Sequence, residues 1–133
     1  MTVQSCVEVT SEWDIVAARQ MGRQIAKEHG FGEVDQARIT TAISELARNI
    51  FLYTNSGKIN IYVIHETDRK GIKIVAKDSG PGIQDIRLAM KDGYSSSGGL
   101  GAGLSGVKRL MDSFNIHSVP GEGTVITVIK WLR

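Results

Sequence analysis

A glycine-rich run followed at once by an amphipathic segment constrains this chain more than any other feature. The run reads Gly98-Gly99-Leu100-Gly101-Ala102-Gly103-Leu104, and the apolar spacing behind it predicts a helix over residues 104–111. Glycines leave backbone N–H groups open to a ligand and allow positive φ without steric cost. A helix N-terminus adds unpaired N–H groups and the positive end of a dipole, which favour an anion. We therefore expect residues 98–104 to bind a polyphosphate.

Two common phosphate-binding motifs do not fit this run. Residues 101–106 match the dinucleotide fingerprint G-x-G-x-x-G, but that motif needs a strand directly before it, and residues 92–97 are polar and loop-like. A Walker A loop is excluded because no Gly-Lys-Ser/Thr follows the glycines. A flexible linker is the remaining alternative, and the apolar residues at the centre of the run make it the less favoured one.

Composition limits the class of protein. The 133 residues suit one domain over residues 1–133, and a net charge of +2 is too small to indicate a nucleic acid or membrane partner. Cys6 is the single cysteine, so neither a disulfide framework nor a thiolate metal site is expected. We expect neither a signal peptide nor a membrane-spanning helix, because no apolar run in the sequence is long enough to span a bilayer. We therefore expect a cytoplasmic protein.

The hydrophobic pattern predicts helices packed on one face of a mostly antiparallel mixed sheet, a two-layer α/β (α+β) sandwich. Ser11 is the expected N-cap of a first helix that ends at Gly30, and Asp35 is the expected N-cap of a second helix that runs to about Tyr53. The strands are expected over residues 5–9, 58–65, 72–78, 114–118 and 124–131, and a short helix over residues 83–90.

Two polar residues border the apolar stripe of the second helix. Glu45 and Asn49 lie one turn apart, beside a stripe made by Ile39, Ile43, Leu46 and Ile50. Their side chains could face a cleft or form a solvated i,i+4 polar pair. The sequence of this helix alone favours the solvated pair.

Asp78 shares one face of its strand with the apolar residues Ile72, Ile74 and Ala76. A carboxylate there is costly unless something hydrogen-bonds it. A turn-starting Asp is the ordinary alternative. Gly80 and Gly82 leave open backbone beside it, which favours a ligand contact.

The order of four short motifs along the chain is more informative than any one of them. They are residues 45–49 on a helix, 78–82 after a strand, 98–104 before a helix and 121–124 opening a strand. In this order and at these spacings they resemble the ATP-binding family of gyrase B, Hsp90, sensor histidine kinases and MutL, which has the Bergerat-type fold. Residues 12–20, 35–49 and 130–133 are similar to those of its anti-sigma-factor serine kinases, in particular the switch kinases of bacterial stressosomes.

The resemblance implies a serine/threonine protein kinase that uses ATP and Mg²⁺. Asn49 would hold Mg²⁺ through its amide oxygen, and Glu45 would orient or deprotonate the attacking hydroxyl. Asp78 would accept a hydrogen bond from the adenine amino group, with Gly80 and Gly82 giving the base access to the backbone. Thr124 would reach adenine through water. The lid around the phosphates and its flanks would be Gly98, Gly99, Leu100, Gly101, Ala102, Gly103 and Leu104.

One position departs from the family pattern. Some anti-sigma-factor kinases carry an Arg just before the lid glycines, where this chain has Ser96 and Ser97. The nearest cations are Lys91 and Lys108. The departure bears on the rate of phosphoryl transfer more than on ATP binding.

The phosphate acceptor is expected on another protein, because His29, His65 and His117 do not suit autophosphorylation. The resemblance implies a Ser or Thr on a STAS-domain antagonist or scaffold protein of a stressosome. It also implies that the released kinase binds and activates an effector, typically a PP2C-type phosphatase. The alternatives are an ATP-gated binding regulator that transfers little or no phosphate, and a helix-on-sheet interaction domain without a ligand.

Strand parity predicts a second surface. If Ile74 and Asp78 face the helices, then Tyr62, Ile64 and Val75 face away from them, and Ile129 and Trp131 are further candidates for that face. An uncovered, partly apolar sheet face suits dimerisation or effector docking.

Overall fold

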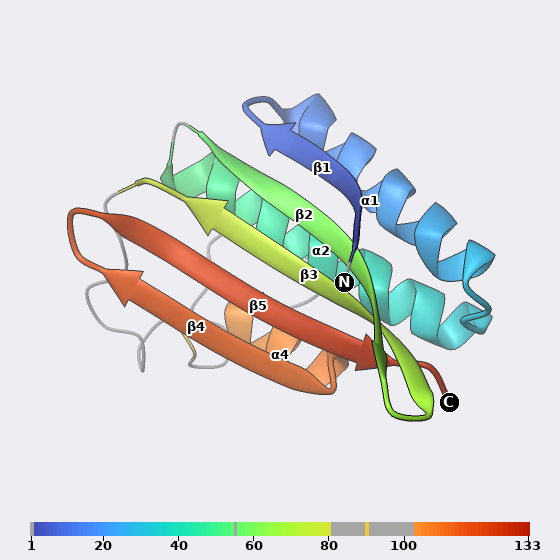
Figure 1. Ribbon diagram of the computed structural model, residues 1–133. Helices are drawn as coiled ribbons and strands as arrows, with labels where there is room; N and C mark the ends of the chain where they lie inside the picture. The colour runs from blue at the N-terminus through green and yellow to red at the C-terminus, as the bar shows by residue number, and fades with distance from the viewer. Residues whose placement is uncertain (1, 55, 81–89, 91–102) are drawn as a thin grey trace.

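The computed structural model describes residues 2–54, 56–80, 90 and 103–133, which form one sheet with helices on one side (Figure 1). The helices are α1 (Glu12–Glu28), α2 (Glu33–Tyr53) and α4 (Gly103–Leu110). The strands are β1 (Thr2–Val9), β2 (Gly57–Glu66), β3 (Arg69–Asp78), β4 (Ser113–Val119) and β5 (Gly123–Trp131). Apart from Met90, the helix expected over residues 83–90 lies outside the described residues.

The described strands form a five-stranded sheet in the order β1-β2-β3-β5-β4, and each neighbouring pair is antiparallel. The expected two-layer architecture is therefore confirmed. β5 lies inside the sheet between β3 and β4, and β1 lies at an edge.

Helix α1 has the predicted ends. The Asp14 carboxylate accepts hydrogen bonds from the backbone N–H groups of Thr10 (2.8 Å) and Ser11 (3.0 Å), and these bonds lower its pKa. His29 is the C-cap, and Gly30 follows with φ +89°, a conformation that favours glycine.

The predicted start of α2 is wrong. The N-cap is Gly32, not Asp35, because the Gln36 N–H already donates to the Gly32 carbonyl at 2.8 Å. Asp35 lies in the first turn, where its carboxylate contacts Arg38 Nη1 at 2.9 Å. An acidic residue stabilises the positive end of the helix dipole from that position as well as from a cap, so sequence alone did not separate the two.

The core lies between the sheet and the helices, where β2 and β3 pack their apolar faces beneath α1 and α2. Gly22 of α1 allows the closest approach, since a Cβ there would overlap the side chain of Ile43 on α2. The largest fully buried side chains are Ile39, Ile43, Leu46, Ile59, Ile61, Ile72, Ile74, Val9, Val107 and Val128. This packing fixes α2 above the middle of the sheet.

No described helix covers the other face of the sheet (Figure 1). Strand register places Tyr62, Ile64, Val75 and Ile129 there, each partly buried, as predicted. Trp131 faces the same way, but it is only 8% exposed because the Arg69 guanidinium lies 3.7 Å from its ring centroid.

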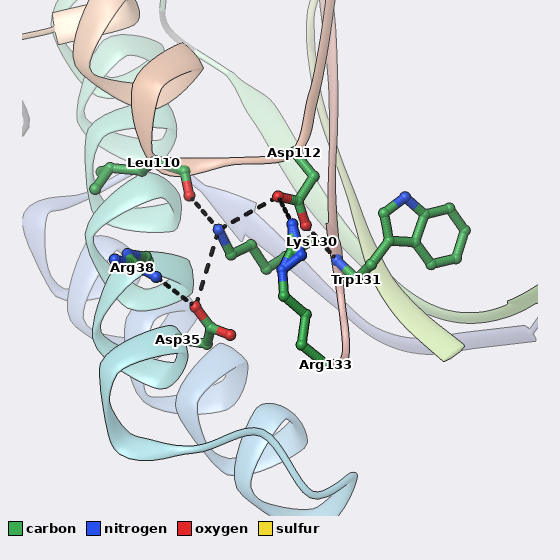
Figure 2. Close-up of polar contacts among 7 residues, drawn as sticks. All are labelled: Asp35, Arg38, Leu110, Asp112, Lys130, Trp131 and Arg133. Atoms are coloured by element: carbon green, nitrogen blue, oxygen red, sulfur yellow. Dashed lines mark hydrogen bonds and ion pairs between the residues drawn. The ribbon is translucent and has the colours of Figure 1, made fainter. Parts of the chain in front are cut away.

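A buried cation joins α4 to α2 at one end of the molecule (Figure 2). Lys130 Nζ donates to the Leu110 carbonyl at the end of α4 at 2.9 Å, and it lies 3.6 Å from Asp112 Oδ1 and 3.9 Å from Asp35 Oδ1. Burial raises the pKa of Asp112. The hydrogen bond from the Trp131 N–H and the charges of Lys130 and Arg133 together lower it by more than burial raises it, so the pKa of Asp112 lies below its usual value.

Candidate functional site

One row of paired residues crosses the sheet at the end where the predicted site residues Asp78 and Thr124 lie. The pairings Val9–Gly57, Gly57–Asp78, Asp78–Thr124 and Thr124–Ser118 are consecutive along this row. Directly paired residues point to the same face, so Asp78 and Thr124 both face the helices. The register thus brings together two predicted site residues that come from different parts of the sequence.

Asp78 ends β3 and is held by the turn that follows it. Its Oδ1 accepts a hydrogen bond from the Gly80 N–H at 2.9 Å, and within the described part of the chain Oδ2 accepts none. A Cβ at Gly80 would lie 2.7 Å from the Thr54 side chain, so glycine is needed where this turn meets the end of α2. Among the described residues, one oxygen of this carboxylate is therefore left for a further donor.

Thr124 is the first residue of β5 that pairs with β3, and it is buried, with 5% of its surface exposed. Its Oγ1 lies 2.8 Å from Ser118 Oγ across the β4–β5 ladder. Gly123, just before it, has φ +130°, and a Cβ there would overlap the Asp78 carbonyl and lie 2.9 Å from Ser79 Cα. Gly123 thus allows β5 to start directly against the end of β3.

The α2 residues Glu45 and Asn49 are less exposed than a solvated pair would be. Glu45 is 4% exposed and Asn49 is partly buried, so the solvated-pair interpretation is wrong for Glu45. The last turn of α2, Ser79 and Gly80 line a cavity of about 340 Å³. Asn49 lies one turn before Tyr53, so Asn49 and Glu45 stand about 6 and 12 Å back along the helix from that end.

The phosphate-binding run is described only at its end. Gly103 and Leu104 begin α4, both are buried, and Gly103 has φ +75°, which favours glycine. The predictions on Gly82, Gly98, Gly99, Leu100, Gly101 and Ala102 lie outside the described residues, as do Lys91, Ser96 and Ser97. Lys108 lies exposed on α4.

Sequence reasoning missed several residues that shape the site. Ser118 could have been predicted by pairing residues 113–119 with the last strand across the turn at residues 120–122. Thr54 could not, because only the tertiary structure brings it next to Gly80. The Arg48 side chain, next to Asn49, buries its Nε without a hydrogen-bond partner in the described part of the chain. No sequence pattern marked that nitrogen as buried.

The oxygen donors that the structure describes fit a magnesium ion that would take most of its ligands from phosphates and water. Among the described residues no group of three or more His, Cys, Asp or Glu side chains could hold a metal. Asn49 and Glu45 offer an amide and a carboxylate oxygen from adjacent turns. Mg²⁺ prefers oxygen ligands and commonly binds through one or two protein oxygens together with phosphates and water.

The chain belongs to the histidine kinase-, DNA gyrase B- and HSP90-like ATPase family, which it matches over residues 34–133. It is 67% identical to the serine/threonine-protein kinase RsbT of Bacillus subtilis over 133 residues, and the match covers the whole of both chains. The chain is thus a serine/threonine-protein kinase that uses ATP. It is also 32% identical to the anti-sigma F factor of Caldanaerobacter subterraneus over 101 residues, covering 72% of this chain and 70% of that one. These relatives make it a kinase of the partner-switching type.

Solved structures agree on the fold. The RsbU and RsbW domains of a Mycobacterium tuberculosis protein match with a TM-score of 0.66 and 16% identity, over 98% of this chain and 33% of that one. The mycobacterial sensor histidine kinase MprB matches with a TM-score of 0.57 and 17% identity, over 97% of both chains. None of the helices that the structure describes has the length and apolar character needed to cross a membrane.

Proposed function

We propose that this kinase, acting as one cytoplasmic domain over residues 1–133, phosphorylates a Ser or Thr on STAS-domain antagonist and scaffold proteins of a stressosome. Once released, it binds and activates a downstream effector such as a PP2C-type phosphatase. The register row that sets Asp78 beside Thr124, under the end of α2, is the observation that carries the proposal. The full-length similarity to RsbT supports the choice of partners.

Adenine is assigned to the Asp78 end of the row. The carboxylate has one oxygen committed to the Gly80 N–H, which leaves the other to accept from the exocyclic amino group of adenine. That pairing accounts for a carboxylate on the apolar face of β3, because the ligand supplies the missing partner. Thr124, held by Ser118, contacts the base through water, and Gly80 and Gly82 let the base approach the backbone.

The phosphates are assigned to residues 98–104 and Mg²⁺ to Asn49. Gly103 and Leu104 stand at the N-terminal end of α4, where backbone N–H groups favour an anion. Mg²⁺, when bound, would neutralise charge on the phosphate oxygens. The Asn49 amide oxygen is the protein donor that would hold it.

Glu45 is the proposed general base. The oxygen of the acceptor Ser or Thr attacks the γ-phosphorus, the bond to the β,γ-bridging oxygen breaks, and ADP leaves with that electron pair. Glu45 takes the hydroxyl proton. Its burial, at 4% exposure, keeps water away from the carboxylate and supports this role over a surface one.

Replacing Glu45 tests the proposal against an ATP-gated binding regulator. Wild type, Glu45→Ala and the control Glu66→Ala, an exposed residue on the β2–β3 hairpin, are incubated with γ-labelled ATP, Mg²⁺ and a STAS-domain protein from the same organism. We expect wild type and Glu66→Ala to label the partner, and Glu45→Ala to bind ATP but lose transfer by at least 10²-fold. ATP binding with no label from any of them would favour the regulator instead.

The uncovered sheet face is assigned to effector docking or homodimerisation. Ile64 and Val75 lie partly exposed there, on neighbouring strands of the face that no described helix covers. If Ile64→Ser changed neither the oligomeric state nor the affinity for the effector, this assignment would be dropped.

A further inference from the structure

The first turn of α1 presents a tryptophan to solvent. Trp13 is 80% exposed, more than any other large apolar side chain that the structure describes. Met21, two turns further along the same helix, is 38% exposed, and Ala17 lies exposed between them. Scattered apolar residues are normal on a surface, but tryptophan is the residue type most enriched among the anchors of protein interfaces.

A row of cations runs beside this apolar strip. Arg19, Arg23 and Lys27 recur every four residues along α1, so they lie on successive turns of one side. No ion pair joins them to another residue within the described part of the chain, whereas Glu28 accepts a hydrogen bond from Gln24 and Asp14 serves the N-terminal cap. Like charges at this spacing weaken a helix. The row therefore suits a function outside the helix, and its field favours a partner with carboxylates.

The exposed tryptophan stands at the same end of the molecule as the candidate site. β1 ends at Val9 in the register row of Asp78 and Thr124, and α1 begins three residues later. The two helices run antiparallel (Figure 1), and they cross where Gly22 meets Ile43. Trp13 lies nine residues, about 14 Å, from the crossing along α1, and Leu52 lies nine residues from it along α2. Because the helices are antiparallel, both residues lie on the same side of the crossing.

We propose that the outer face of α1 docks the phosphoacceptor protein, with Trp13 as the anchor and the Arg19-Arg23-Lys27 row as the charged contact. The occupant is a folded protein that presents an apolar socket beside carboxylates. A second copy of this chain is a poorer occupant, because pairing about a two-fold axis near Arg23 would bring the two cationic rows together. The inference rests on the proposed function only for the identity of the acceptor.

Docking is measured by titration in the absence of ATP, and phosphoryl transfer is measured in its presence. The STAS-domain protein is titrated into the nucleotide-free kinase while tryptophan emission is followed, since Trp13 is exposed and the other tryptophan, Trp131, is already buried. The initial rate of phosphoryl transfer then gives KM and kcat for the acceptor. The variants are Trp13→Ala and Arg23→Glu, and the matched controls are Val34→Ala, which is 64% exposed on α2, and Lys70→Glu on the β2–β3 hairpin.

We expect the emission of wild type to shift on titration, and Trp13→Ala to raise the acceptor KM by roughly 30-fold with ATP affinity and kcat unchanged. Arg23→Glu should raise KM roughly tenfold at low salt and less at high salt, and the controls should match wild type. Unchanged KM values, no shift with wild type, or a shift caused by self-association would each overturn the docking surface. A shift without transfer would instead overturn the catalytic proposal and leave the docking surface standing.

Discussion

Asp78 of β3 and Thr124 of β5 are direct partners in the antiparallel ladder, with both side chains on the face that the helices cover. One member of the pair is a half-buried carboxylate whose Oδ2 accepts no hydrogen bond from the described residues, and the other is a buried hydroxyl 2.8 Å from Ser118 Oγ. The two are held by backbone pairing, so the floor of the proposed site is formed by the sheet itself.

Asp78→Asn should separate nucleotide binding from folding. The Asn Oδ1 can still accept from the Gly80 N–H, but an NH₂ group replaces the oxygen proposed to accept from adenine. We expect the Kd for ATP to rise roughly 30-fold, about 2 kcal/mol, with little change in thermal stability. Calorimetric titration measures the Kd, and Asp68→Asn in the exposed β2–β3 turn is the control. Unchanged affinity would remove Asp78 from the adenine site.

Gly123→Ala should be far more damaging than Gly121→Ala. Gly121 has φ +84° with open space around its Cβ position, so Ala there costs only backbone strain of about 1–2 kcal/mol. At Gly123 the strain adds to an overlap with the Asp78 carbonyl, which raises the expected cost to about 3–5 kcal/mol. Urea unfolding of both variants measures the difference. Equal free energies of unfolding would contradict the close approach of β5 to the end of β3.

Lys130→Met should loosen α4. The substitution removes the donor to the Leu110 carbonyl and a cation beside Asp35 and Asp112, although Arg38 and Arg133 still pair with those carboxylates. We expect a loss of about 2–4 kcal/mol in the free energy of unfolding. Amide hydrogen exchange should show faster exchange in α4 than in the wild type, and Lys70→Met is the control. Equal protection of α4 in both proteins would show that Lys130 does not hold this helix.

Stability should fall in acid partly through Asp112. Its folded-state pKa is lowered, so its contribution is fully present above the unfolded value of about 3.8 and is lost as pH falls through the folded pKa. Wild type should therefore lose stability more steeply below pH 4 than Asp112→Asn. Because Asp14 also has a lowered pKa and acts equally in both proteins, the difference between the two curves isolates Asp112. Parallel curves would mean that Asp112 gains nothing from its partners.

Local patterns predicted much of this fold and part of the site. Alternation along residues 72–78 put Asp78 on the apolar face, and the register confirms it. The N-cap at Ser11 and the end of the first helix at Gly30 depend on residues close in sequence, so both could be predicted.

Features that depend on tertiary contacts could not be predicted from the sequence. Glu45 sits at the edge of a helical stripe, and its burial depends on what packs over that edge. Strand alternation places Lys130 on the core face of β5. The residues near it in the sequence do not indicate that Leu110, Asp35 and Asp112 are its partners. Asp35 belonged to that same cluster and was mistaken for a cap, since both roles ask for a carboxylate at the start of a helix.

The row opposite the site pairs Thr2 with Val63, Val63 with Ile72 and Ile72 with Lys130. Both ends of the described chain, Thr2 and Arg133, therefore emerge at the far edge of the sheet from Asp78 and Thr124 (Figure 1). An affinity tag, a fluorophore or a surface tether attached beside Thr2 or Arg133 would lie at the opposite end of the strands from the proposed adenine site and from Trp13. Attachment beside Thr2 or Arg133 would thus leave the proposed adenine site and the proposed docking helix facing the solution.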